Sequence, residues 1–147
     1  MLGGVERAKQ FIDDLAKQGI SAHLAMISKQ RAKAGVVSSM HLIGDVNGAD
    51  AILVDDICDT GGTLVLAAQL LKEQGANRVF AAITHGVFSG QALERIGNST
   101  IDELVISDTI PLNSLAPSNI QRISVAPLLA EAIRRIHNSE SVSVLFR

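Results

Sequence analysis

The chain has 147 residues, of which 47% are hydrophobic and 19% are charged, and its formal net charge is −2. This length and apolar content suit one globular domain with a buried core. The basic residues are outnumbered and dispersed, which argues against a nucleic-acid partner. No stretch reaches the roughly 18 consecutive apolar residues that a membrane span needs. The single cysteine, Cys58, excludes an internal disulfide and is typical of a protein in the reducing cytoplasm.

Predicted strands and helices alternate along the chain. Apolar spacing predicts helices over residues 5–19, 64–74, 91–96 and 127–137. Short apolar runs predict strands over residues 21–27, 51–54, 78–84, 104–107, 120–125 and 141–146. Residues 28–39 read as a mobile basic loop or as the arms of a loose hairpin, and residues 110–119 as irregular. The alternation indicates an α/β fold with a mostly parallel sheet flanked by helices, in which ligands bind at the carboxyl ends of the strands.

Two of these segments carry predictions about burial. Residues 51–54 are continuously apolar, which predicts a strand that is covered on both faces. The helix over 127–137 begins with a proline, where the absent N–H does no harm. Its apolar side chains recur at helical spacing, and we expect four of them to face inward: Leu129, Ala132, Ile133 and Ile136.

An acidic, glycine-rich segment follows the 51–54 strand and is predicted to form a loop over 55–63. Gly61 and Gly62 allow a tight turn and a close approach of the backbone to a ligand. Thr60 and Thr63 offer hydroxyl groups, and the free N–H groups of the next helix favour an anion. The pattern predicts a phosphate cradle; its alternative is a capped helix after an acidic turn.

Two carboxylates, Asp55 and Asp56, stand at the end of the same strand. They lie too close to the cradle to bind the same phosphate. Carboxylates accept hydrogen bonds from sugar hydroxyls, either directly or through a bound Mg²⁺. The segment therefore predicts a site for a sugar phosphate.

Residues 52–63 resemble the phosphoribosyl pyrophosphate signature of type I phosphoribosyltransferases and of ribose-phosphate pyrophosphokinases. The resemblance implies that Asp55 and Asp56 bind the 2- and 3-hydroxyls of ribose 5-phosphate. It also implies that the 5-phosphate is held by Asp59, Thr60, Gly61, Gly62 and Thr63. Cys58 falls at a variable position of the signature, and we expect a buried or half-buried structural thiol there.

The segment Ile27-Ser28-Lys29-Gln30-Arg31 resembles the catalytic loop of the pyrophosphokinases. By itself such a loop is typical of a solvated basic surface. The resemblance implies that Lys29 and Arg31 stabilise charge on the transferring diphosphoryl group, with Arg31 also contacting substrate.

Two later segments favour the same family over ordinary phosphoribosyltransferases. Residues 84–90 resemble a loop that contributes to an allosteric phosphate site, which would place a regulatory phosphate at Ser89 and Gly90. An N-cap serine and a turn glycine are an equal alternative. His85 is expected to be a packed or interface histidine. Residues 130–146 match the family's C-terminal segment nearly position by position.

The resemblance implies that residues 1–147 form a single phosphoribosyltransferase-like domain, the C-terminal half of an enzyme whose N-terminal half is absent. That half supplies ATP contacts and a Mg²⁺-binding histidine, and a family aspartate that binds metal would fall at Met1. We therefore assign no metal ligand within this chain. We expect a homo-oligomeric full-length enzyme that uses Mg²⁺ and ATP, and a fragment that is inactive alone. The alternatives are a stand-alone phosphoribosyltransferase and a non-catalytic regulatory subunit.

Overall fold

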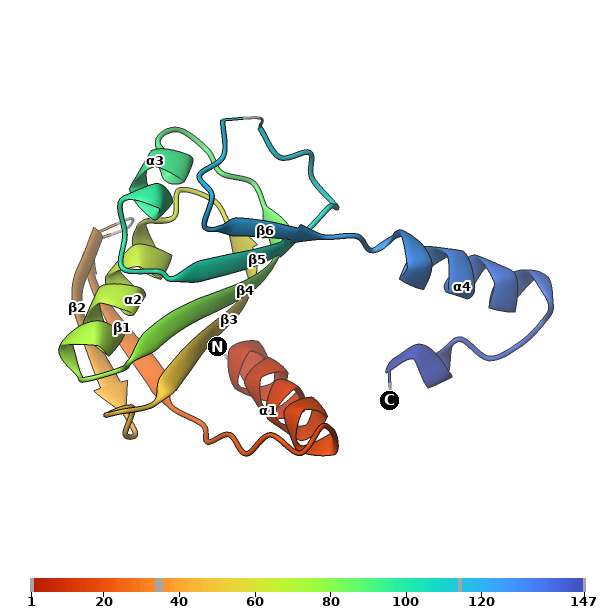
Figure 1. Ribbon diagram of the computed structural model, residues 1–147, viewed down its shortest axis with the longest axis horizontal. Coiled ribbons are helices and arrows are strands. Elements are labelled where there is room, and N and C mark those ends of the chain that lie inside the picture. Colours follow the sequence, from red (N-terminus) through yellow and green to blue (C-terminus); the bar gives the residue numbers. More distant parts are fainter. Residues whose placement is uncertain (1, 34–35, 114, 147) are drawn as a thin grey trace.

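The computed structural model describes residues 2–33, 36–113 and 115–146 (Figure 1). Its helices are α1 (Leu2–Lys17), α2 (Gly62–Glu73), α3 (Ala92–Gly97), α4 (Ala126–His137) and a short 3₁₀ helix, η1 (Ser143–Phe146). Its strands are β1 (Met26–Lys33), β2 (Val36–Ile43), β3 (Asp50–Cys58), β4 (Arg78–Gly86), β5 (Glu103–Ser107) and β6 (Ile120–Ile123). No described helix is long and apolar enough to cross a membrane.

The central sheet has four parallel strands in the order β3-β4-β5-β6. Each strand is added on the same side of the one before it, and crossovers between parallel strands are right-handed, so α2 and α3 lie on the same face. Figure 1 shows these two helices as neighbours. The strand β4 buries Val79, Ala81 and Ile83 in alternation, as expected for one well-covered face. The predicted parallel sheet flanked by helices is confirmed.

Helix α1 lies beside β3 (Figure 1) and presents a half-buried apolar stripe that includes Val5, Phe11 and Leu15. This confirms the helical spacing of the N-terminal segment. The cover of β3 is incomplete, because Ile52 remains 43% exposed. The prediction that this strand is covered on both faces is therefore wrong. A continuous apolar run indicates a buried strand, but β3 is an edge of the sheet, where one helix covers only part of its surface.

The strands β1 and β2 form an antiparallel hairpin that is separate from the central sheet. Of the two alternatives for residues 28–39, the structure has the hairpin arms, while residues 34–35 lie outside the described residues. The predicted strand over 21–27 is largely wrong, since β1 begins only at Met26. Pairing explains this boundary: Met26 is the first residue with a partner, Ile43, and a strand needs a partner for its backbone groups.

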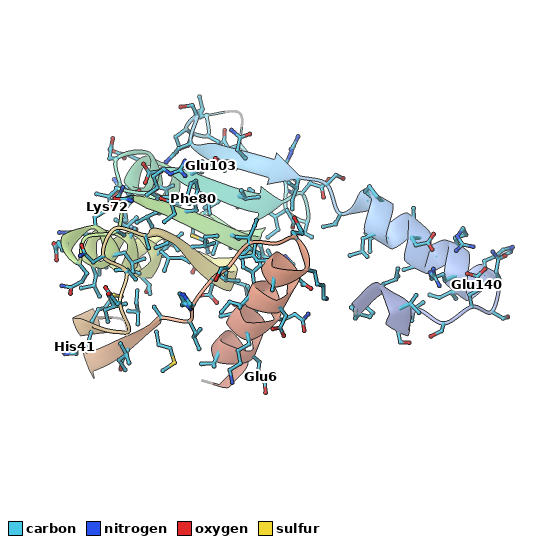
Figure 2. The ribbon with its side chains drawn as sticks, turned by 60° about the horizontal axis from the view of Figure 1, so that its bottom comes forward. Glu6, His41, Lys72, Phe80, Glu103 and Glu140 are labelled. Carbon is cyan, nitrogen blue, oxygen red and sulfur yellow. The ribbon has the colours of Figure 1, made fainter. Side chains whose placement is uncertain are left out.

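The C-terminal segment extends away from the sheet as an arm, seen in Figure 1 and in Figure 2, where Glu140 marks its far end. Helix α4 has no buried residue, and Leu129, Ile133 and Ile136 are 56%, 67% and 67% exposed. The predicted inward face is wrong, because an amphipathic pattern defines a face without supplying the surface that covers it. The predicted strand over 141–146 is also wrong: these residues have no neighbouring strand and contain η1.

Ion pairs within the arm stabilise α4, which has no covering layer in the described structure. Arg134 and Arg135 both donate to Glu131, at the i, i+3 and i, i+4 spacings that bring side chains together on a helix. The hydrogen bond from Arg134 is the main reason why the pKa of Glu131 falls to about 2. The same arginine reaches Glu140 beyond the helix end, at 3.0 Å.

Candidate functional site

The acidic pair lies within a strand and not in the predicted loop. Strand β3 continues to Cys58, so Asp55 and Asp56 belong to it, and Asp55 stands opposite Ile83 of β4. The strand is longer than expected because β4 also continues to Gly86 and offers backbone partners to the end. The loop is therefore a short turn that follows the strand. This places both carboxylates at the carboxyl end of β3, where ligands of parallel sheets bind.

The turn leads directly into α2. Gly61 is the N-cap residue, with a φ of 72°, a left-handed conformation that costs other residues about 1–2 kcal/mol. Its carbonyl oxygen accepts the first helical hydrogen bond, from Val65 N at 3.0 Å. No side chain caps this helix end. The N–H groups of the first turn are thus available to an anion, which the helix dipole also favours.

A cleft of about 270 Å³ opens over this turn. All five predicted phosphate-binding residues line it, together with Asp55 and an apolar floor, the full set being Leu53, Val54, Asp55, Ile57, Cys58, Asp59, Thr60, Gly61, Gly62, Thr63, Leu64, Ala67 and Ile83. Asp56 is not among the lining residues. The structure thus brings the turn and one carboxylate into a single cleft, with the second carboxylate at its border.

Cys58 lies beneath the turn and is only 4% exposed. Burial raises the pKa of its thiol to about 11, because the charged thiolate would lose its hydration. The side chain belongs to the hydrophobic core. The expectation of a buried structural thiol is confirmed.

The loop after β4 packs against the turn through backbone hydrogen bonds. Val87 N donates to the Cys58 carbonyl at 3.0 Å, and Ser89 N donates to the Asp59 carbonyl at 3.0 Å. Ser89 is not an N-cap, because α3 has Gln91 at that position without a side-chain hydrogen bond. Gly90, with a φ of 60°, is a turn glycine. A regulatory phosphate at Ser89 and Gly90 stays a prediction.

His85 is half-buried near the end of β4, and its Nδ1 lies 2.8 Å from Thr109 Oγ1. The hydroxyl of Ser107 continues this polar contact by donating to the Thr84 carbonyl at 2.6 Å. The histidine is therefore packed into a hydrogen-bonded cluster, as expected.

Two arginines that sequence reasoning missed contact the site. Arg7 of α1 binds the acidic pair, with Nη1 3.2 Å from Asp55 Oδ1 and Nη2 3.2 Å from Asp56 Oδ2. Arg95 of α3 donates to the Thr60 carbonyl and so braces the turn from the other side. Neither arginine forms a short motif with the residues it contacts, since each lies more than thirty positions away in sequence. Only the three-dimensional arrangement reveals them.

The acidic pair carries concentrated negative charge. The pKa of Asp56 lies below its ordinary value because of its neighbours, the adjacent Asp55 side chain first, then its own backbone N–H, with the Arg7 charge adding to the effect. Two carboxylates suit Mg²⁺, which is commonly held by one or two of them together with substrate phosphates. Among the described residues, no three His, Cys, Asp or Glu side chains cluster as a metal site.

The two basic residues predicted for catalysis, Lys29 and Arg31, are located by their backbone alone. They lie in β1, opposite Met40 and Val37 of β2. Their side chains are outside the described part of the structure. Their role in stabilising charge on the transferring diphosphoryl group stays a prediction.

Known proteins resemble this chain throughout its length. Residues 10–147 match the family described as the phosphoribosyl synthetase-associated domain. The chain is 51% identical to a ribose-phosphate pyrophosphokinase of Shewanella oneidensis and 52% identical to one of Hyphomonas neptunium, over 99% of its own length but only 45% and 46% of theirs. A solved phosphoribosylpyrophosphate synthetase of Mycobacterium smegmatis is 37% identical, with a TM-score of 0.81 over 93% of this chain and 43% of that one. The chain thus spans less than half the length of these relatives, and it belongs to the phosphoribosyl synthetase-associated domain family.

Proposed function

We propose that this chain is the ribose 5-phosphate-binding part of a ribose-phosphate diphosphokinase, which transfers the diphosphoryl group of ATP to ribose 5-phosphate for nucleotide biosynthesis. The observation that carries the proposal is the cleft over the β3–α2 turn. It combines an uncapped helix N-terminus, a glycine in the left-handed conformation and an adjacent carboxylate, which together match the two ends of a sugar phosphate. The family and its pyrophosphokinase relatives support the same reaction.

Each part of the site has a role in this proposal. The backbone N–H groups and the hydroxyls of Thr60 and Thr63 bind the 5-phosphate, which leaves the sugar ring pointing toward the end of β3. Asp55 and Asp56 accept hydrogen bonds from the ring hydroxyls and so orient the 1-hydroxyl. Lys29 and Arg31 neutralise charge on the diphosphoryl group.

In the reaction, the 1-hydroxyl oxygen bonds to the β-phosphorus of ATP and releases its proton to solvent, the bond from that phosphorus to the AMP oxygen breaks, and AMP leaves. Bound Mg²⁺ supplies positive charge beside the phosphates in such transfers. We infer that ATP is held mainly by the half of the enzyme that relatives have in addition, so that this chain binds sugar phosphate but catalyses little alone. A homo-oligomeric enzyme in the cytoplasm is part of the same proposal; the free, buried Cys58 fits the reducing conditions of that compartment.

Calorimetric titration of ribose 5-phosphate in the presence of Mg²⁺ tests the site. Thr63→Ala and Thr60→Ala each remove a hydroxyl that can donate to the phosphate, so each should weaken binding roughly tenfold. Thr100→Ala, at an exposed position outside the cleft, is the matched control and should bind like the unaltered chain. Equal affinity in all three variants would contradict the proposed phosphate site, and ATP-dependent AMP formation by the chain alone would contradict its inactivity.

A further inference from the structure

Arg7 connects the N-terminal helix to the acidic pair. Its guanidinium spans Asp55 and Asp56, with one nitrogen 3.2 Å from an oxygen of each carboxylate. The arginine side chain is 35% exposed and the two carboxylates are 60% and 58% exposed, so all three lie at the surface beside the cleft. A planar guanidinium is suited to such a bridge, because its N–H groups point in fixed, divergent directions.

The ion pairs with Arg7 hold together two side chains that the geometry of a strand would direct apart. Successive side chains of a strand point to opposite faces, so Asp55 and Asp56 do not converge by backbone geometry alone. They can be drawn together here because β3 is an edge of the central sheet and α1 lies beside it. Two ionised carboxylates at neighbouring positions repel each other, and the Arg7 charge offsets this repulsion.

The hydrogen bonds divide the carboxylate oxygens into two sets. Asp55 Oδ1 accepts from Arg7 and also from Asp56 N, which lies 2.9 Å away, and Asp56 Oδ2 accepts from Arg7. None of these three bonds uses Asp55 Oδ2 or Asp56 Oδ1, so one oxygen on each carboxylate can face a ligand. One remaining oxygen on each of two adjacent carboxylates matches two hydroxyls on neighbouring carbons, each of which donates one hydrogen bond.

We propose that Arg7 is a positioning residue that holds Asp55 and Asp56 with one oxygen each turned to the vicinal hydroxyls of a sugar phosphate. This inference deepens the proposed function and rests on it. Arg7 itself touches neither the phosphate nor the reacting atoms in this arrangement. Its removal should therefore affect recognition of the sugar and spare recognition of the phosphate.

The test compares two probes, ribose 5-phosphate and inorganic phosphate, by calorimetry on the whole chain. Arg7→Gln should weaken ribose 5-phosphate binding roughly tenfold and leave inorganic phosphate binding unchanged. Arg7→Lys keeps the charge but not the fork, so it should recover part of the loss. Lys17→Gln is the matched control, because it removes another cation of α1 whose partner is Asp14; it should change neither affinity.

Three results would overturn the inference: unchanged sugar binding in Arg7→Gln, tighter sugar binding there, or equal loss for both probes. Tighter binding would mean that the guanidinium competes with the sugar, and equal loss would mean a structural role. If the unaltered chain binds no ribose 5-phosphate, the proposed function fails and the inference fails with it; if it binds and Arg7→Gln binds equally well, the inference fails alone.

A ligand-free measurement checks the contact itself. In carbon-13 NMR spectra at one neutral pH, Arg7→Gln should shift the side-chain carboxyl signals of Asp55 and Asp56 and leave that of Asp108 in place. Lys17→Gln should move none of the three. Unmoved signals for the acidic pair in Arg7→Gln would overturn the inference whatever the sugar does.

Discussion

Two regions of the molecule, the body around the cleft and the C-terminal arm, both have the apolar spacing of regular helices or strands. Only the body is packed. Strands β3 to β5 with α2 and α3 contain most of the residues of the hydrophobic core. Helix α4 has a well-defined apolar face and no buried residue. The contrast separates two properties that a sequence pattern mixes: a tendency to form an element, which both regions have, and a surface to pack against, which the body alone supplies.

The functional consequence lies in the cleft. Its turn is fixed by the packed strands and helices below it, by backbone bonds from the loop after β4, and by Arg95 from α3. Sites held on such supports keep their geometry without a ligand. Three predictions test how far this support reaches.

The first prediction compares a buried isoleucine of the body with an exposed isoleucine of the arm. Ile106 of β5 is 1% exposed, so Ile106→Ala leaves a cavity and should lower the free energy of unfolding by about 3 kcal/mol. Ile133 of α4 is 67% exposed, and Ile133→Ala should change it by less than about 0.5 kcal/mol. Urea unfolding followed by circular dichroism measures both.

Equal destabilisation by the two substitutions would contradict the contrast between body and arm, because it would show that α4 is covered in solution. A large effect of Ile106→Ala alone would support the contrast.

The next effect distinguishes the two glycines of the turn. Gly61 has a positive φ, and an added Cβ would meet the Ile96 side chain at 3.4 Å. Gly61→Ala should therefore cost about 1–2 kcal/mol of stability. An added Cβ at Gly62 meets nothing closer than 3.9 Å, and its φ is not positive, so Gly62→Ala should be close to neutral. Thermal unfolding of both variants is the measurement, and a loss at Gly62 equal to that at Gly61 would contradict the assigned turn geometry.

A further effect concerns the thiol beneath the turn and appears only at alkaline pH. Burial raises the pKa of Cys58 from 9.0 to about 11. Below pH 9 the thiol is neutral in the folded and the unfolded chain. Between pH 9 and 11 it ionises only when unfolded, so the free energy of unfolding should fall as the pH rises through this window. Cys58→Ala has no thiol to ionise, so from pH 8 to pH 10.5 it should lose less stability than the unaltered chain. Equal losses in the two proteins would mean that the thiol is hydrated in the folded chain.

Much of the fold and part of the site were predictable from the sequence. The β3–α2 turn was predictable, because its glycines and threonines and the apolar helix that follows form a recognisable local pattern. The partners of the acidic pair were not, since Arg7 joins it only after α1 has packed beside β3. The same reason explains the errors at residues 21–25 and 141–146, where the missing information was the presence or absence of a pairing strand. Local turn chemistry can be predicted from the sequence, whereas the burial of a helix face and the pairing of a strand depend on distant segments.

The exposed face of α4 also changes how a common folding assay must be interpreted. Dyes such as 8-anilinonaphthalene-1-sulfonate fluoresce on accessible apolar surface, and their binding usually marks a loosely packed state. Large aliphatic side chains of α4 meet water in the fully folded chain, among them Leu128, Leu129, Ile133 and Ile136. The native protein should therefore give a dye signal of its own. For this chain, fluorescence of the dye is a baseline of the folded state, and loss of packing has to be followed by another probe.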